Sequence, residues 1–130
     1  MPDSNSIAEL EKAAQALREA LEFSRQVAGD DIKFKIARDA CIQRFEYCVE
    51  LAWKVSMRKL GSQTKFAKPA VREMARGDLV DHADVWLGFI EARNESSHSY
   101  DENVARKVFA EILKFEIAVE DLMSRLRKLS

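Results

Sequence analysis

Between residues 93 and 100 the chain gathers side chains that could act on a phosphate group. A guanidinium, an amide, a hydroxyl, an imidazole and a phenol fall within eight consecutive residues: Arg93, Asn94, Ser97, His98 and Tyr100. Arginine binds phosphate oxygens through a fork of N–H donors. Histidine can take a proton from a ribose 2′-hydroxyl or give one to a leaving oxygen. This segment therefore suggests phosphate chemistry, with Asn94 one turn before His98 and able to orient its ring.

Helical spacing puts four of these side chains on one side of a helix predicted over Asp81–Ser97. The apolar stripe of that helix is made of three residues, Trp86, Phe89 and Ile90. Continued by helical steps, the stripe turns polar at Arg93 and Ser97. Asn94 and His98 lie just beside it, so that the four side chains share an arc of roughly 140°.

An arginine on a core-facing stripe is costly unless it is paired or faces a cleft, which leaves two interpretations of Arg93. In one, Arg93 pairs with an acid on the following helix or on a second subunit, and His98 is a helix-terminal histidine favoured by the helix dipole. In the other, the two residues form an active site. Spacing alone favours the first interpretation, because structural ion pairs are common, and the grouping of polar types within eight residues weakens it.

The elements that must position this segment are all helices. Their predicted ranges are Ser6–Ala28, Asp31–Leu60, Phe66–Arg76, Asp81–Ser97 and Glu102–Leu129. Gly61 and Gly77 follow helix ends, and Asp81 and Asp101 stand at N-cap positions. The predicted fold is all-α: an antiparallel up-and-down four-helix bundle with one extra short helix, in a single domain over residues 1–130.

Two of the helices indicate where the core lies. The helix over Asp31–Leu60 is apolar around much of its circumference, which is typical of a central helix. The last helix has a stripe at alternating spacings of four and three residues: Val104, Val108, Ile112, Phe115, Val119, Leu122, Leu126 and Leu129. The stripe of Trp86, Phe89 and Ile90 could face the central helix or, equally, a symmetry mate.

Charge is balanced overall but uneven along the chain. The sequence has 21 Lys and Arg against 22 Asp and Glu, a formal net charge of −1 that argues against a general polyanion binder. The stretch Lys54–Gly77 is basic, and the stretch Asp78–Glu102 is acidic except for Arg93. The two blocks could be solvated helix faces, or a basic strip for RNA and an acidic strip for a basic partner.

Metal and cofactor chemistry find little support in the residues. Cys41 and Cys48 are seven residues apart on one helix, too far for a disulfide, and suit a reducing cytoplasm as buried small hydrophobes. Glu46 and Glu50 lack the histidine motifs of a di-metal bundle. Without a Gly-rich phosphate loop, ATP binding by this chain alone is not expected. We expect no metal, no cofactor, no signal peptide and no membrane span.

Beyond these physical arguments, the stretch Arg93–Tyr100 resembles the Arg-x4-His-x-Tyr signature of HEPN proteins that pair with a minimal nucleotidyltransferase. A polar residue directly after the arginine is typical of members thought to be nucleases, and Asn94 fits. Other passages are similar to the branch called nucleotidyltransferase substrate-binding proteins, or HepT-like toxins. They run from Ile42 to Lys54, from Pro69 to Glu73 and from Val85 to Leu87, in the family's order.

The resemblance implies a cytoplasmic homodimer in which the Arg93 and His98 sets of two subunits line a shared cleft. Active relatives are metal-independent ribonucleases and toxins. Their antitoxin, the minimal nucleotidyltransferase, can transfer AMP to the tyrosine of the motif, here Tyr100. Arg93 would hold the scissile phosphate, His98 would be the acid or base and Asn94 would position it, with Ser97 as an auxiliary residue. The alternative is a non-catalytic substrate-binding or adaptor subunit, which the acidic block around the motif favours because it would repel RNA.

Overall fold

All regular secondary structure is α-helical in residues 6–98 and 101–129, the part of the chain that the computed structural model describes. The five helices are α1 (Ile7–Gln26), α2 (Asp31–Leu60), α3 (Ala67–Arg76), α4 (Ala83–Ser96) and α5 (Glu102–Lys128). Every bound lies within two residues of the predicted one. The all-helical fold with one short additional helix is therefore confirmed.

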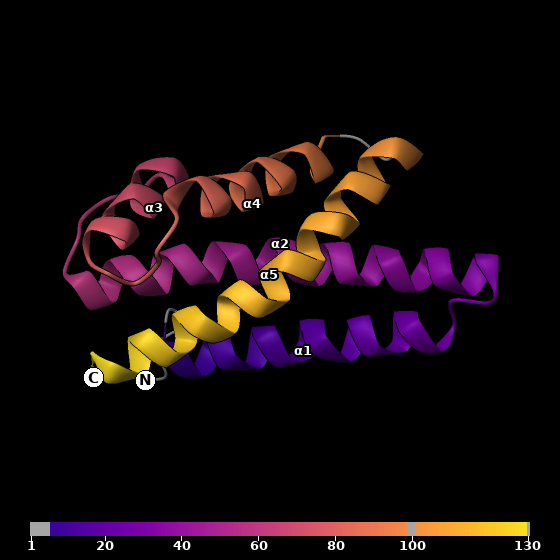
Figure 1. Ribbon diagram of the computed structural model, residues 1–130, viewed down its shortest axis with the longest axis horizontal. Helices are drawn as coiled ribbons and strands as arrows, with labels where there is room; N and C mark the ends of the chain where they lie inside the picture. The colour runs from indigo at the N-terminus through magenta and orange to yellow at the C-terminus, as the bar shows by residue number, and fades with distance from the viewer. Residues whose placement is uncertain (1–5, 99–100, 130) are drawn as a thin grey trace.

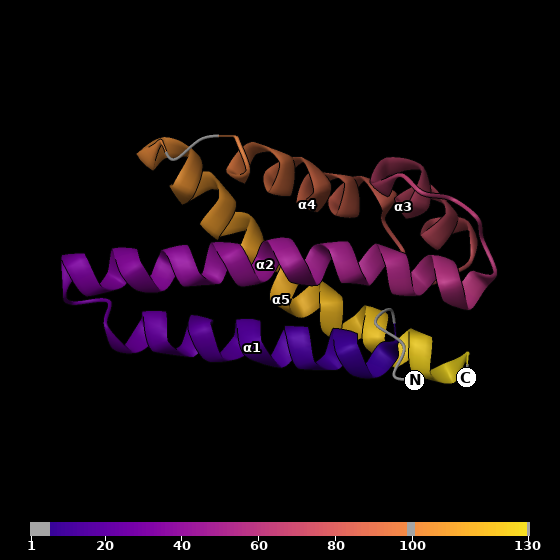
Figure 2. The ribbon, with the colours of Figure 1, turned by 180° about the vertical axis from the view of Figure 1, so that it is seen from behind.

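The helices are arranged around α2. In Figures 1 and 2, α1 and α2 run antiparallel along their length, α3 and α4 lie along another side of α2, and α5 crosses α2 obliquely. α2 contacts each of the other four helices, as its apolar circumference predicted. The end of α5 returns to the start of α1, where Arg127 Nη2 lies 3.4 Å from Glu11 Oε2.

Local signals at the helix ends explain most of these bounds. Gly61 ends α2 in the left-handed conformation, with φ of 68°, where glycine carries no steric cost. Asp101 caps α5 by accepting a hydrogen bond of 2.7 Å from the backbone N–H of Asn103. Asp30 caps α2 in the same way, through the backbone N–H of Lys33 at 3.0 Å.

The predicted N-cap of α4 is wrong. His82 occupies the N-cap position and makes no side-chain cap hydrogen bond. Asp81 instead accepts a hydrogen bond of 2.7 Å from Arg125 Nη2 on α5. A charge-assisted bond to a guanidinium is stronger than one to a backbone N–H, so the neighbouring helix wins the carboxylate. The same bond holds the pKa of Asp81 below its ordinary value.

Four aromatic rings form the centre of the core and settle where the stripe of α4 faces. The ring of Phe115 stands edge to face with those of Phe45, Trp86 and Phe89, at centroid distances of 5.2, 5.6 and 5.2 Å. These rings come from α2, α4 and α5. The stripe of α4 is therefore covered within one chain and offers no support for a dimer.

The structure also tests the predicted burial of the cysteines and of the α5 stripe. Cys41 and Cys48 are fully buried and free, as predicted. The stripe of α5 is buried from Val108 to Leu126, but Leu129 is 52% exposed, because it follows the last helical residue and has no neighbouring helix to cover it. No helix within the described ranges has the length and apolar character needed to cross a bilayer.

Candidate functional site

The polar segment begins in the last turn of α4, where hydroxyl groups satisfy the helix's terminal carbonyls. Ser97 Oγ donates to the carbonyl oxygen of Asn94 at 2.9 Å. The single proton of Ser96 Oγ is shared between the carbonyl oxygen of Arg93, at 2.9 Å, and a carboxylate of α2 described below. The last carbonyls of a helix lack N–H partners from a following turn. The serines after Arg93 thus stabilise the end of the helix, which holds the Arg93 and Asn94 backbone in a defined place.

Arg93 faces an acid of α2. Its Nε lies 3.2 Å from Glu50 Oε1, an ion pair whose angle is too bent for a hydrogen bond. Lys54 Nζ lies 3.7 Å from the other oxygen of the same carboxylate. Glu50 thus lies between two cations. The sequence had suggested an acid on the last helix or on a second subunit; α2 supplies it because α4 runs antiparallel beside it.

A second contact joins the same two helices one turn along. Ser96 Oγ donates to Glu46 Oε2 at 2.6 Å. Sequence reasoning missed Ser96, and it weighed Glu46 and Glu50 only as metal ligands. The spacing of Glu46 and Glu50 places both acids on one side of α2, but no local rule says which helix that side faces. Within the described ranges no three His, Cys, Asp or Glu side chains gather as a metal site.

Arg93 opens onto a hollow rather than into the core. Its side chain is 34% exposed and contributes to a surface hollow of about 530 Å³ between α2 and α4. The other lining residues come from α2: Gln43, Glu46, Tyr47, Glu50, Leu51 and Lys54. We call this the Arg93 hollow. The guanidinium is therefore held in place by a carboxylate while remaining accessible to a ligand.

The remaining predicted site residues lie on the solvent side of the same helix end. Asn94, Ser97 and His98 are exposed. Asn94 Oδ1 lies 3.5 Å from Arg93 Nη1, at the limit of a hydrogen bond, so its observed neighbour is the arginine. The backbone N–H of His98 donates to the carbonyl oxygen of Glu95 at 3.1 Å. Orientation of the imidazole by Asn94 stays a prediction, and Tyr100 lies outside the described residues.

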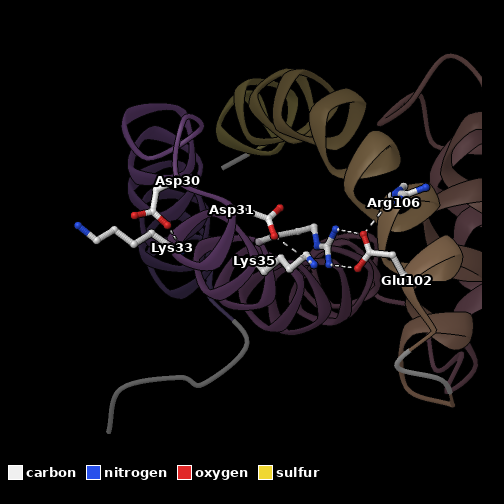
Figure 3. Close-up of polar contacts among 7 residues, drawn as sticks. Asp30, Asp31, Lys33, Lys35, Glu102 and Arg106 are labelled. Atoms are coloured by element: carbon white, nitrogen blue, oxygen red, sulfur yellow. Dashed lines mark hydrogen bonds and ion pairs between the residues drawn. The ribbon is translucent and has the colours of Figure 1, made fainter.

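A buried arginine fixes the chain immediately after the motif. Arg38 of α2, whose side chain is 8% exposed, donates from Nη1 and Nη2 to the two carboxylate oxygens of Glu102, each at 2.8 Å. Arg106 Nε also lies 3.2 Å from Glu102, as Figure 3 shows. The hydrogen bonds from Arg38 lower the pKa of Glu102 to about 2. The first turn of α5, four residues after His98, is thereby held against α2.

A second hollow is lined by the Arg38 and Glu102 pair and lies next to the Arg93 hollow. It measures about 640 Å³ and lies between the first half of α2, the end of α4 and the start of α5. Gln43 and Glu46 line both hollows, while Ser97 and Arg38 line this one alone. Ser97 therefore borders this hollow, while its hydroxyl donates to the carbonyl oxygen of Asn94. Sequence reasoning did not select Arg38, which stands within an otherwise ordinary charged run.

The two charge blocks partly neutralise one another. Lys68 of α3, in the basic block, lies 3.6 Å from Glu91 of α4, in the acidic block. Glu95 of the acidic block instead pairs at 3.4 Å with Lys107 of α5, which lies outside the basic block. These contacts are surface ion pairs, as the solvated-face interpretation supposed. The start of the basic block behaves differently, because Lys54 lines the Arg93 hollow.

The sequence of this chain is similar to a known protein family and to a named bacterial protein. The family model described as "Nucleotidyltransferase substrate binding protein like" matches residues 5–128. A Haemophilus influenzae protein named "Probable ribonuclease HepT" is 32% identical in an alignment of 95 residues that covers 67% of this chain. That match spans 65% of the relative's own length.

Two solved structures share the fold. One, from Haemophilus influenzae, is described as revealing the fold of a substrate binding domain of a nucleotidyltransferase. It superposes with a TM-score of 0.79 at 26% identity, over 93% of this chain and 98% of that one. The other, a crystal structure from Thermus thermophilus, has a TM-score of 0.72 at 28% identity, over 88% and 98% of the two chains.

Proposed function

The chain belongs to the nucleotidyltransferase substrate-binding-protein-like family, and on that premise we propose that it is the partner subunit of a minimal nucleotidyltransferase and a metal-independent ribonuclease acting through Arg93 and His98. The observation that carries the proposal is the accessible, carboxylate-held Arg93 at the mouth of a hollow, with the exposed His98 five residues further on. The likeness to a relative named a probable ribonuclease supports the nuclease part.

The proposed chemistry needs no metal. The guanidinium of Arg93 binds the scissile phosphate, and His98 takes the proton of the ribose 2′-hydroxyl. The 2′-oxygen then bonds to phosphorus while the bond from phosphorus to the 5′-oxygen breaks. A second imidazole, supplied by the other copy in a homodimer, protonates that leaving oxygen. The products are a 2′,3′-cyclic phosphate and a 5′-hydroxyl, and Asn94 and Ser97 assist by positioning the phosphate.

Tyr100 is the proposed point of control. The partner nucleotidyltransferase transfers AMP from ATP to the Tyr100 phenol oxygen, releasing pyrophosphate. A nucleotide added two residues after His98 would put a bulky anion beside the site and exclude RNA. Intact-mass and peptide mass spectrometry after co-expression with the partner would detect the added AMP. Its absence from Tyr100 would contradict this step alone.

A second function is favoured by a specific contact. Glu50 neutralises Arg93 at 3.2 Å, and Glu46 adds another carboxylate to the same hollow. Both would repel RNA phosphates. The alternative is therefore a non-catalytic substrate-binding or adaptor subunit, which presents a ligand or Tyr100 to the nucleotidyltransferase.

The two histidines of the chain provide a matched test of catalysis. Purified protein is incubated with single-stranded RNA in EDTA, beside His98→Ala and His82→Ala variants. His82 is the control because it is exposed at the opposite end of α4. We expect His98→Ala to lower the cleavage rate by about 10²- to 10⁴-fold, the usual contribution of a general acid or base, and His82→Ala to leave it unchanged. Equal cleavage by all three proteins, or none by any, would rule out this ribonuclease.

The partner and the dimer require separate measurements. A minimal nucleotidyltransferase encoded beside this gene should co-purify with a tagged copy of the chain. Light scattering coupled to size exclusion should give the mass of a dimer at micromolar concentration. A monomer would remove the shared-cleft mechanism, while co-purification without RNA cleavage would favour the adaptor function.

A further inference from the structure

The outward side of α2 continues from the Arg93 hollow toward the end of the helix. A further hollow of about 410 Å³ lies there, lined by the cations Lys54, Arg58 and Lys65 and by Trp53, among others. We call this the Lys54 hollow. Lys54 lines both hollows, so the two are neighbours on one surface.

Side chains on this side of α2 that could contact a ligand recur at helical spacing. Tyr47, Glu50, Lys54 and Arg58 are spaced by three, four and four residues, which places them in one row of about 16 Å. Tyr47 is 56% exposed, so its ring is accessible to a stacking partner. The row thus runs from an exposed ring, past the Arg93 and Glu50 pair, to a group of cations.

The cations at the end of the row stand on an ordered framework. Lys54 Nζ lies 5.6 Å from the centre of the Trp53 ring, a cation–π contact. Lys65 belongs to the loop between α2 and α3, whose hydroxyl groups are held by one acid of α3. Ser62 Oγ donates to Glu73 Oε1 at 2.7 Å, and Thr64 Oγ1 donates to the other oxygen of Glu73. Because this loop is already ordered, Lys65 loses less conformational entropy when a ligand binds.

The ring of Trp53 forms part of the wall of this hollow. The indole N–H of Trp53 is buried and has no hydrogen-bond partner among the described residues, although Trp53 lines the Lys54 hollow. Buried donors in proteins are normally satisfied. A ligand rich in acceptor oxygens, such as a phosphate backbone, would suit the cations of this hollow, while the indole N–H lies beneath the surface and is not counted as a contact.

We propose that single-stranded RNA lies along the outward side of α2, with one base stacked on Tyr47 and with the phosphates beyond Arg93 held by Lys54 and Lys65. This inference rests on the proposed function and specifies its substrate path. An exposed ring followed by cations is the arrangement that binds single strands, because every base can stack and every phosphate carries charge. An acidic protein partner would match the cations but would leave the stacking ring unexplained.

The test separates binding from cleavage. The parent protein carries His98→Ala, so that RNA stays intact, and a fluorescent single-stranded RNA is titrated by anisotropy over a range of salt concentrations. Lys54→Gln with Lys65→Gln removes two cations of the path. Lys33→Gln with Lys114→Gln is the control, because it removes the same charge from exposed positions outside both hollows. Tyr47→Ala is compared with Tyr47→Phe.

The path variant should bind RNA several-fold more weakly, and its slope of log affinity against log salt should fall by about 1.4, at about 0.7 for each single-strand phosphate contact. Tyr47→Ala should weaken binding and Tyr47→Phe should not. Equal losses of RNA affinity in the path and control variants would overturn the proposed path. A path variant that binds RNA normally and loses only its affinity for the nucleotidyltransferase would overturn it too. A wild-type protein that cleaves RNA while the path variant keeps the same KM would overturn the path and leave the proposed function standing.

Discussion

Arg38 and Glu102 form a two-pronged hydrogen-bonded pair, with both donor–acceptor distances at 2.8 Å, between the buried side of α2 and the first turn of α5. Glu102 follows the N-cap Asp101 directly and lies four residues after His98. A bidentate pair fixes direction as well as distance. It therefore holds the chain on the far side of the motif, while the contacts of Glu46 and Glu50 hold the near side.

Loss of this pair should appear as a change in acid stability. The pKa of Glu102 is lowered from 4.5 to about 2 by the hydrogen bonds from Arg38. A carboxyl group whose pKa is depressed on folding contributes stability above its unfolded pKa and loses it as the pH falls toward its folded pKa. Glu102→Gln should therefore lower the Tm at pH 7. Between about pH 4.5 and pH 2, the Tm of this variant should also fall less than that of the wild type, as measured by circular dichroism.

Glu22→Gln is the control for that measurement, because Glu22 is exposed and contacts only Arg25 of its own helix turn among its described ion pairs. It should keep the wild-type dependence on pH. Wild type and Glu102→Gln curves that stay parallel down to pH 2 would contradict the assigned role of the pair.

The aromatic centre should dominate the stability of the core. Phe115 is fully buried against three other rings, so Phe115→Ala removes both apolar burial and edge-to-face contacts. We expect a loss of about 3–5 kcal/mol in the free energy of unfolding, measured with urea. Ile117→Ala, two residues on and 75% exposed, should change it by less than about 0.5 kcal/mol. Similar losses for both would be inconsistent with this packing.

The two cysteines should be unreactive in the folded protein. Burial raises the pKa of Cys41 to about 11 and that of Cys48 to about 12, so both remain protonated thiols at pH 8. Only the thiolate is an effective nucleophile. A chromogenic disulfide reagent should therefore label neither thiol in native protein and both after unfolding in guanidinium. Rapid labelling of native protein at pH 8 would show that the core around α2 opens.

Glu50 should restrain RNA binding at the Arg93 hollow. Its carboxylate lies between Arg93 and Lys54, in the place where a phosphate would meet both cations. Glu50→Gln keeps the shape but removes the charge, and in the His98→Ala background we expect RNA affinity to rise several-fold, most clearly at low salt. Glu91→Gln, which removes a charge from the ion pair with Lys68, is the matched control. Weaker binding by Glu50→Gln would contradict this prediction and mean that the hold of Glu50 on Arg93 outweighs its repulsion of phosphate.

Much of the helical framework could be read from local patterns. The bounds of α2 follow from Asp30, Gly61 and an apolar circumference, all of which act within a turn or two of the chain. The apolar stripe of α5 could be predicted from its alternating spacings of four and three residues alone. Asp81 marks where this approach fails, because its carboxylate was taken by Arg125 across the bundle, and no local rule ranks such a competitor.

For the candidate site, the sequence by itself determined the chemical types and their order on α4, since helical spacing places Arg93 and Ser97 on a continued stripe. The resemblance of the segment from Arg93 to Tyr100, together with the passages from α2 onward, suggested the family that the family model then showed. Only the tertiary structure decided which carboxylate faces Arg93, that Ser96 rather than Ser97 reaches α2, and that Arg38 holds the start of α5. Those partners are 43 to 64 residues apart in the chain. The partners from α2 and α4 meet because these helices pack antiparallel, and Arg38 meets Glu102 because the start of α5 lies against the first half of α2, which α5 crosses obliquely. The register between packed helices is set by side chains throughout the core rather than by the residues that pair.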